Sequence, residues 1–459
     1  MQATTRSLLL SSLAIAALAL VGPLTTGVLD AQQNQAVRLA AADLSPAATD
    51  ATPTFYADVL PILQQNCQTC HRTEGANMGG QIAPWPLVTY EDARIRAPRI
   101  AKAVREGRMP PWSAADWHKG TFENERVLED DEKATIIAWA EEGTPAGNPA
   151  DAPPTPDFLL STLNGGSEWT LGEPDLILQF DEEYCLDDDL RDIYVDIPLH
   201  ISVEQLPKDR WIKSIEYRNG PAVHHIVGGV GGLVPGAEPR VYEEGYGRLL
   251  RAGPRDVNFN MHYNKTPGPG TAVCSNIKVG ITFKEPGEVI RFVTGGDGLF
   301  IRPIVIPPGA PSYSASREYT FEEDVELLRF MPHMHLRGKA ALYEVTYPDG
   351  RHETLLHVPN YAFNWQHSYR FADPPFIPAG SVLRFTLWWD NSENDPANPD
   401  PSAEVRWGRP THAEMSQGYM SFRKMEERHI VVGEEIPADV IADSSDDQVD
   451  QVDDSNNNR

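Results

Sequence analysis

Basic residues are scarce in this chain. Its 459 residues include 39 lysines and arginines against 66 aspartates and glutamates, so the formal charge at pH 7 is −27. A surface this acidic repels the phosphate groups of nucleic acids and of anionic lipids, so nucleic acid is not an expected partner. Hydrophobic residues still make up 41% of the chain, which excludes wholesale disorder and indicates a globular protein.

Long apolar runs are also missing. The main apolar stretch, residues 7–21, falls short of the ~20 residues that a membrane-spanning helix needs, and Gly22-Pro23 follows it. Because Arg6 precedes it and small residues come after it, residues 1–31 are typical of a cleaved signal peptide. We expect an exported, periplasmic protein without stable membrane insertion. An uncleaved anchor is the alternative.

Cysteine is rare as well. Two of the four cysteines stand in Cys67-Gln-Thr-Cys70-His71. This C-x-x-C-H spacing is typical of covalent haem attachment, in which the thiols bind the haem vinyl groups and the histidine lies under the iron. A thioredoxin-like redox pair and half of a zinc site are the alternatives. A thioredoxin motif follows a strand and a zinc site needs a second Cys/His pair nearby, whereas residues 56–63 form a short amphipathic helical pattern. The context favours one covalent haem c.

The sixth ligand of this haem is expected to be Met109, because the two prolines after it would fix a ligand loop and a helix is predicted at 131–142. Met78 is a second candidate, and Met109 could instead be a core side chain. A thioether opposite a histidine raises the haem potential and suits an electron carrier. Residues 53–148 resemble a small class I c-type cytochrome, and a semi-rigid, proline-rich linker follows at 149–168.

Beyond this linker the hydrophobic period changes to two. Apolar residues alternate with more polar ones at 193–201, 277–283 and 383–387, which is the pattern of half-buried strands. Residues 347–351 contain Pro, Asp and Gly and predict a hairpin turn. Strand and turn signals at short spacing over roughly 260 residues predict antiparallel β-sandwich structure that is too long for one sandwich.

The histidines of this region are grouped. His224 and His225 are adjacent, His262 follows, and His333 and His335 form an H-x-H pair. Positions i and i+2 of a strand face the same side, so His333 and His335 can reach one ion. Adjacent residues share an ion only at a bulge or a strand end. A single histidine is usually an ordinary surface or core residue, but three groups within about 110 residues favour metal binding.

The kind of metal follows from the donor atoms. No aspartate or glutamate belongs to the adjacent pair or to the H-x-H pair. Calcium, magnesium and facial-triad iron need oxygen ligands, so these metals are not expected here. Imidazoles suit copper or zinc. An added thioether would favour copper, because soft sulfur stabilises Cu(I).

Four motifs occur in an order that one enzyme family shares. They are Pro221-Ala-Val-His224-His225-Ile226, Met261-His262-Tyr263, His333-Met334-His335 and Ala413-Glu414-Met415-Ser-Gln-Gly-Tyr419-Met420. Over residues 170–430 they resemble the copper type II, ascorbate-dependent monooxygenases, which include the peptidylglycine α-hydroxylating and dopamine β-monooxygenases. With the haem motif in front, the chain is similar to bacterial fusions of a c-type cytochrome with such a monooxygenase.

The resemblance implies two copper ions, each in its own β-sandwich. One copper stores and passes an electron, while the other binds dioxygen and faces the substrate C–H bond. The residues carried over are His224, His225 and His262 for the first copper, and His333, His335 and Met415 for the second. Met415 could instead be a core methionine.

One departure from the family bears on the substrate. Members that hydroxylate peptides carry an arginine two residues before the H-x-H pair, and Met331 stands there in this chain. Tyr419 matches a tyrosine that helps to hold the peptide and is counted with the catalytic residues, while Gln417 stands where those members have asparagine. A peptidylglycine substrate is therefore in doubt, and the expected substrate is a small or peptide-like molecule.

The expected fold class is multidomain: a small all-α class I cytochrome c domain followed by two antiparallel, jelly-roll-like β-sandwich copper domains. The expected boundaries are a signal peptide at 1–31, a linker at 32–52, the cytochrome c domain at 53–148, the proline-rich linker at 149–168, the sandwiches at 169–303 and 304–432, and an acidic disordered tail at 433–459. Cys185 and Cys274 fall in the first sandwich of an exported chain and predict a disulfide; two buried free thiols are the alternative.

The expected function is that of an exported oxidoreductase. It would insert one atom of dioxygen into a substrate C–H bond and reduce the other to water, with electrons from the haem, an ascorbate-like reductant or a redox partner protein. Two alternatives remain. The chain could be a non-catalytic electron-transfer and copper-binding protein, or a zinc hydrolase that uses His333 and His335 and has no need of Met415.

Overall fold

The structure is a computed structural model that describes residues 52–73, 83–157 and 169–443, apart from residues 181, 219, 221, 229 and 426. The described residues from Pro53 onward belong to one compact unit. The expected signal peptide, the linker up to residue 51, the alternative ligand Met78 and the tail from 444 lie outside the described residues. No helix in the described part of the chain has the length and apolar character of a membrane span.

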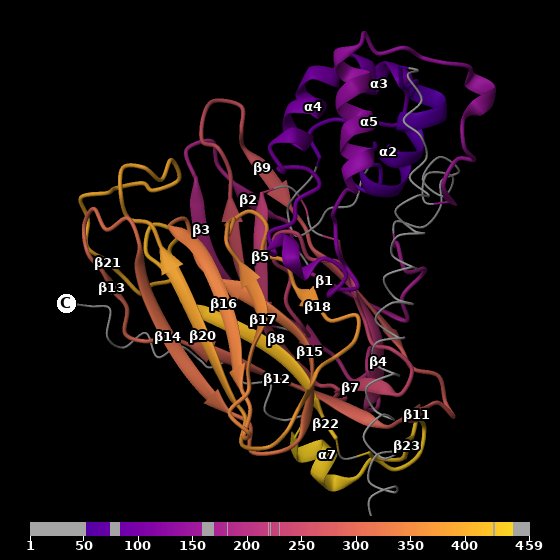
Figure 1. Ribbon diagram of the computed structural model, residues 1–459. Coiled ribbons are helices and arrows are strands. Elements are labelled where there is room, and N and C mark those ends of the chain that lie inside the picture. The colour runs from indigo at the N-terminus through magenta and orange to yellow at the C-terminus, as the bar shows by residue number, and fades with distance from the viewer. Residues whose placement is uncertain are drawn as a thin grey trace, which may run out of the picture. The chain divides into compact units, whose positions relative to one another are not determined.

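Short helices make up the N-terminal part of the described chain (Figure 1). They are η1 (Phe55–Val59), α2 (Leu60–Asn66), α3 (Tyr90–Arg94), α4 (Ala97–Arg105), η2 (Asp116–His118), α5 (Asp130–Glu141) and η3 (Pro149–Asp151). Capping boxes begin α3 at Thr89 and α5 at Glu129, which satisfies backbone N–H groups that a helix start leaves without partners. Phe55, Leu63 and Trp139 are buried together between these helices.

Strands dominate the rest, and the largest sheet has ten of them. In spatial order it contains β1 (Leu176–Gln179), β10 (Lys278–Phe283), β4 (Arg210–Arg218), β7 (Tyr246–Leu250), β12 (Phe292–Phe300), β22 (Gln417–Lys424), β15 (Val325–His333) and β18 (Tyr369–Arg370), with β6 (Arg240–Val241) beside β4 and β19 (Phe376–Ile377) beside β15. The β7–β12 pair is parallel, and the other pairs of this sheet are antiparallel.

Smaller antiparallel sheets accompany it. They are β14 (Tyr313–Thr320), β20 (Val382–Trp389), β16 (Gly338–Thr346) and β17 (His352–Val358); β3 (Asp192–Ile201), β8 (Arg255–Asn264) and β5 (Val223–Gly228); and the pairs β2 (Tyr184–Leu186) with β9 (Val273–Ser275), β11 (Val289–Ile290) with β23 (Ile430–Val431), and β13 (Val305–Ile306) with β21 (Val405–Arg406). The predicted hairpin turn is present between β16 and β17, where Gly350 has a positive φ of 85°.

Two large apolar cores lie among these sheets. One contains Ile215, Phe259 and Ile281, and the other contains Phe330 and Phe385. The predicted alternation at 277–283 and 383–387 is present, since every second side chain of these segments is buried. Burial of each large apolar side chain stabilises the fold by about 1.5–3 kcal/mol relative to leaving it exposed.

The expected fold class is wrong. Strand makes up 36% of the structure and helix 14%, and no small all-α cytochrome domain stands apart within the described residues. The physical reason is that the helical segment keeps only part of its apolar side chains to itself: Ala114 and Phe122 are buried in the same core as Phe330, and Phe122 pairs with Phe371 in a β-bridge. The ten-stranded sheet also joins strands from both sides of the expected boundary at 303, because β12 pairs with β22.

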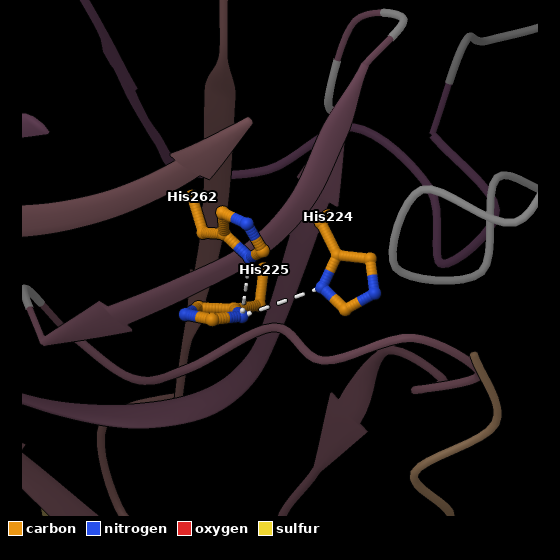
Figure 2. A group of neighbouring side chains, drawn as sticks. All are labelled: His224, His225 and His262. Atoms are coloured by element: carbon orange, nitrogen blue, oxygen red, sulfur yellow. Dashed lines mark hydrogen bonds between the residues drawn. The ribbon is translucent and has the colours of Figure 1, made fainter. Parts of the chain in front are cut away.

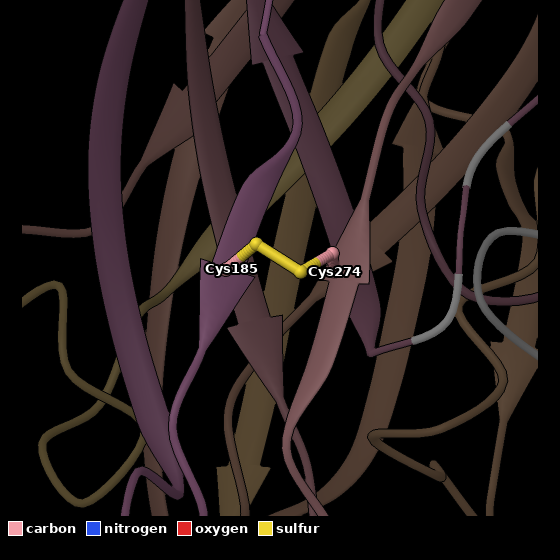
Figure 3. Close-up of a disulfide and its surroundings, with 2 residues drawn as sticks. All are labelled: Cys185 and Cys274. Carbon is pink, nitrogen blue, oxygen red and sulfur yellow. A yellow bond between two sulfur atoms is a disulfide. The ribbon is translucent and has the colours of Figure 1, made fainter.

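The predicted disulfide between Cys185 and Cys274 is present (Figure 3). The two cysteines face each other directly in the β2–β9 pair, with Cα atoms 4.0 Å apart, and join positions 89 residues apart in sequence. At the other end, helix α7 (Ala438–Asp443) buries Val440 against Trp211 and Ile290. Residues 438–443 of the expected disordered tail are therefore helical and have apolar side chains to bury.

Candidate metal centres

Three histidines converge in what we call the first centre, defined as His224, His225 and His262. His224 and His225 lie on β5 and His262 on the neighbouring β8, and one ligand atom of each lies within 4.8 Å of the others. Nδ1 of His225 is 3.5 Å from Nδ1 of His224 and 3.3 Å from Nδ1 of His262. Figure 2 shows dashed lines from one ring nitrogen of His225 to the rings of His224 and His262. The same ring nitrogen of all three side chains faces one point.

A backbone irregularity brings the adjacent pair together. The register of β5 against β8 shifts between Val223 and His225, and Ala222 just before it has a positive φ of 65°. A shift of this kind turns a side chain away from the face that regular alternation would give it. His224 and His225 can therefore contribute to one site. Adjacent residues of a strand do so only at a bulge or at a strand end.

A carboxylate orients His262. Nε2 of His262 lies 2.5 Å from Oδ1 of Asp192, and because a carboxylate only accepts, Nε2 carries the proton and Nδ1 is left with its lone pair. Oδ2 of Asp192 accepts the hydroxyl proton of Thr411 at 2.6 Å. Although partial burial acts to raise it, hydrogen bonds from His262 and Thr411 hold the pKa of Asp192 below its ordinary value. The ring of Tyr194 stacks on His262 at 4.1 Å.

Burial keeps the imidazoles of His224 and His225 neutral. It lowers the pKa of His224 to about 3 and that of His225 well below the ordinary value, and the charge that neighbouring imidazoles would carry acts in the same direction. The neutral imidazole is the form that binds a metal ion. His224 and His225 therefore each offer an unprotonated ring nitrogen at neutral pH.

The second centre is defined as His333, His335 and Met415. Nε2 of His333 lies 3.3 Å from Sδ of Met415, while its Nδ1 donates to Oε1 of Gln366 at 2.6 Å. Nδ1 of His335 donates to the carbonyl of Ala413 at 3.2 Å, and its Nε2 is buried without a hydrogen-bond partner among the described residues. Each imidazole thus keeps a proton on Nδ1 and leaves Nε2 as a ligand atom.

The H-x-H pair does not have the predicted strand geometry. Strand β15 ends at His333, so His335 lies in the turn beyond it and the two rings stand 5.4 Å apart at 89°. A buried carboxylate, Glu414, shapes this turn by accepting the backbone N–H groups of His335 and Arg337, both at 2.8 Å. Burial raises the pKa of Glu414 to about 8 despite these hydrogen bonds. Burial also lowers the pKa of His333 to about 4.

The two centres are neighbours. The rings of His225 and His333 lie 6.3 Å apart. Phe363 touches both centres, because its ring stacks on His224 at 4.3 Å and lies 5.9 Å from His335. Electrons exchanged between metals at these positions would cross a short, largely buried gap.

Tyr419 lies next to the second centre but is not a ligand. Its hydroxyl donates to Oε1 of Gln417 at 2.6 Å, and Nε2 of Gln417 is 3.6 Å from Sδ of Met415. Met331 is directly opposite Tyr419 in the β15–β22 pair. Gln417 therefore lies beside Met415, and Met331 lies across from Tyr419 on the neighbouring strand.

The C-x-x-C-H motif follows directly on α2. Cys67 caps the helix, and the backbone N–H groups of Cys70 and His71 return to the carbonyl of Cys67. Neither cysteine is in a disulfide. Nδ1 of His71 lies 3.0 Å from the carbonyl of Trp85, so it carries the proton and Nε2 is available as a ligand atom. These features fit covalent haem attachment.

The expected sixth ligand, Met109, follows α4 and is half-buried, and no described contact joins it to His71. The residues after Met109 do contact the second centre. The imidazole of His367 donates to the carbonyl of Pro111, and its neighbour Gln366 accepts from His333. A bonded route of few residues thus links the Met109 segment to His333.

Comparisons with known proteins add no family. No family model matches the sequence, and no curated protein matches it. A Paenibacillus xanthan lyase aligns with a TM-score of 0.17 and 11% identity, over 55% of this chain and 25% of the lyase. The VP2 subviral particle of infectious bursal disease virus aligns with a TM-score of 0.16 and 8% identity, over 55% of this chain and 80% of VP2. A two-domain Bacteroides fragilis protein of unknown function aligns with a TM-score of 0.15 and 7% identity, over 58% of this chain and 99% of that protein. The aligned region spans only a quarter of the lyase. Likenesses this weak carry no argument.

Several residues at these centres were missed by sequence reasoning. They are Asp192, Phe363, Gln366, Thr411 and Glu414. Glu414 stands beside Met415 in the matched motif and could have been noticed there. The other four lie far in sequence from the residues that they touch, and only the folding of the chain brings them close.

Proposed function

We propose that this chain is an exported, copper-dependent monooxygenase that hydroxylates a substrate C–H bond. The observation that carries the proposal is the pair of adjacent centres, with the His225 and His333 rings 6.3 Å apart. In the reaction one atom of dioxygen enters the C–H bond and the other leaves as water, which consumes two electrons and two protons. Copper bound at both centres would supply these electrons singly and would bind dioxygen at the second centre.

The donor atoms support copper over other metals. The first centre presents imidazole nitrogens only, since Asp192 is engaged with the far nitrogen of His262 rather than with the point where the three Nδ1 atoms meet. The second centre adds the thioether of Met415 beside His333. Hard cations need oxygen ligands and thioethers are soft, so this set favours copper.

The chain itself prepares the ligand atoms. Asp192 sets the tautomer of His262, and Gln366 and the Ala413 carbonyl do the same for His333 and His335. Partners of this kind orient metal ligands and raise their basicity. The burial of the histidines also excludes water, which protects reactive species from side reactions.

The substrate pocket is proposed to lie at the second centre, beside Tyr419, Gln417 and Met331. These side chains are uncharged, so none of them offers a cationic partner for a substrate carboxylate. A small or peptide-like substrate without a terminal carboxylate fits this set better than a peptidylglycine.

A covalent haem c is proposed at Cys67, Cys70 and His71, with Met109 as the sixth ligand. The support is the Cys67-x-x-Cys70-His71 spacing, together with the orientation of His71 by the Trp85 carbonyl. When bound, this haem would pass single electrons. Protein from a periplasmic expression host should keep haem on a denaturing gel, and Cys67→Ser with Cys70→Ser should lose it.

The function is tested by metal analysis and oxygen uptake. Purified protein should contain copper and should consume dioxygen in the presence of ascorbate only when an acceptable substrate from a screen is added. Copper without substrate-dependent uptake would indicate a non-catalytic electron-transfer or copper-binding protein. Zinc in place of copper, with hydrolysis that does not depend on Met415, would indicate a zinc hydrolase.

A further inference from the structure

One short segment of the chain touches both metal centres. We call it the linking loop and define it as Thr411–Met415, which lies just before β22. At its first residue, the hydroxyl of Thr411 donates to Oδ2 of Asp192, whose other oxygen accepts Nε2–H of His262 in the first centre. Thr411 is 6% exposed, so water does not replace this hydrogen bond easily.

The other end of the linking loop belongs to the second centre. The carbonyl of Ala413 accepts Nδ1–H of His335, Glu414 accepts its backbone N–H, and Sδ of Met415 lies 3.3 Å from Nε2 of His333. Glu414 is fully buried, and Trp389 also donates to it at 3.2 Å. These contacts make the loop a rigid connection rather than a loose one.

We propose that Asp192 and Thr411 are positioning residues that couple metal binding at the two centres. The inference rests on the proposed function, because it requires metal at both. A metal ion at the first centre fixes His262, and through it the carboxylate of Asp192. The carboxylate then holds Thr411, and the linking loop places Met415 and the Ala413 carbonyl for the second centre. By reciprocity, metal at the second centre strengthens the first.

The chemistry of the link is strong enough for this role. Hydrogen bonds to an ionised carboxylate are roughly twice as strong as those between neutral groups. Partners of metal-ligating histidines typically change metal affinity by about 10–100-fold when they are removed. A coupling of about tenfold lies inside the usual range for linked sites.

Removing one hydroxyl tests the link. Thr411→Val keeps the shape of the side chain but cannot donate to Asp192, whereas Thr411→Ser keeps the hydroxyl. Each is combined with His225→Ala, which removes a ligand of the first centre, and the Cu(I) affinity of the second centre is measured by competition with a chromophoric chelator. Two bound cations repel each other in every background, so this repulsion cancels in the comparison.

The expected result is a background-dependent effect of His225→Ala. For each residue at position 411, the Cu(I) affinity of the second centre with His225 present is divided by the affinity with His225→Ala. This ratio should be about tenfold higher with Thr411 or Thr411→Ser than with Thr411→Val. The Cu(II) spectrum of the first centre should also change in Asp192→Asn but not in the control Thr386→Val, whose hydroxyl pairs with Ser316 across β20 and β14.

Two results would overturn the inference, and they can be told apart. Copper at both centres with equal ratios in Thr411→Val and Thr411→Ser would remove the coupling and leave the proposed function standing. No copper at either centre of the unaltered protein would remove the proposed function and the coupling with it. Circular dichroism of every variant shows whether it is folded.

Discussion

Nδ1 of His225 and Nδ1 of His262 lie 3.3 Å apart. Two N–H groups cannot face each other at this distance, so at most one of these nitrogens carries a proton. Nδ1 of His224 faces the same point at 3.5 Å from His225. Three nitrogen lone pairs that converge in a buried place repel one another unless a cation or shared protons lie between them. The first centre could therefore hold a metal ion of the kind that proteins bind through nitrogen.

Replacing His225 by alanine should lower the copper content by about one ion per chain, because metal affinity depends on the full ligand set. The second centre should keep its ion. Copper is measured by elemental analysis after removal of loosely bound metal. His200→Ala is the matched control, since this imidazole is exposed and bonds to Asp256 away from both centres. Equal copper loss in the two variants would contradict the assignment.

Replacing Met415 by isoleucine should weaken the second centre and lower or abolish hydroxylation, while the haem spectrum stays intact. Met415 supplies the sulfur of this centre, and Cu(I) prefers soft ligands. Turnover and Cu(I) affinity are measured together. Met420→Ile is the control, because Met420 lies five residues further along the chain and is buried in the apolar core. An exchange of similar volume in a core lowers the free energy of unfolding by less than about 1.5 kcal/mol. Full turnover in Met415→Ile would show that no thioether is needed.

Replacing Cys185 and Cys274 together by alanine should lower the free energy of unfolding by about 4 kcal/mol in the chain-entropy view. The bond closes a loop between positions 89 apart in sequence, and its removal frees the unfolded chain. Urea unfolding of the double variant and of the unaltered protein measures the difference. A mass-spectrometric map with both thiols unmodified in exported protein would contradict the bond itself.

Local patterns predicted several strands, and histidines that they singled out lie together in the structure. The alternation at 277–283 and 383–387 is present because a strand with one buried face must place apolar side chains at every second position. The structure also brings His262 to the adjacent pair His224 and His225, 37 positions from His225, and places His333 beside Met415, 82 positions away.

Long-range pairing could not be predicted in the same way. Thr411 and Asp192 are 219 positions apart, and nothing in either local pattern indicates the hydrogen bond between them. The expected all-α domain failed for a related reason. Helices are present within 53–148, as the sequence predicts. The side chains of Ala114 and Phe122, however, pack into a β-core, and the composition of the segment does not indicate which surface they will contact.

Acid should destabilise the protein through His367. Burial, together with the charge of Arg126, lowers the pKa of His367 to about 3 from its ordinary 6.5. Between these values the unfolded chain binds a proton here that the folded chain does not, so the free energy of unfolding falls as pH falls. From pH 7 to pH 5 this contribution amounts to about 2 kcal/mol. Urea unfolding of metal-free protein at both pH values should show a smaller loss in His367→Phe. An equal loss would mean that His367 is protonated in the folded state.

Electrons from the haem should reach copper at the second centre. The segment after Met109 bonds through Pro111 to His367, and the neighbouring Gln366 bonds to His333, so a continuous route of bonds is in place. Haem and copper are both one-electron centres, and each transfer would oxidise Fe(II) to Fe(III) as Cu(II) becomes Cu(I). The alternative is that the haem only docks a respiratory partner while ascorbate serves the copper directly.

A stopped-flow experiment separates the two. The haem is reduced, dioxygen and substrate are added, and haem reoxidation is followed by absorbance in the intact protein and in a variant that carries His333→Ala and His335→Ala. Reoxidation should be slower in the variant, because its haem has lost the acceptor, and His367→Phe should slow it partly because the route through Pro111 is broken. Elemental analysis of His367→Phe must show unchanged copper for the comparison to hold. Equal rates in the intact protein and the double variant would mean that the haem does not supply the second centre.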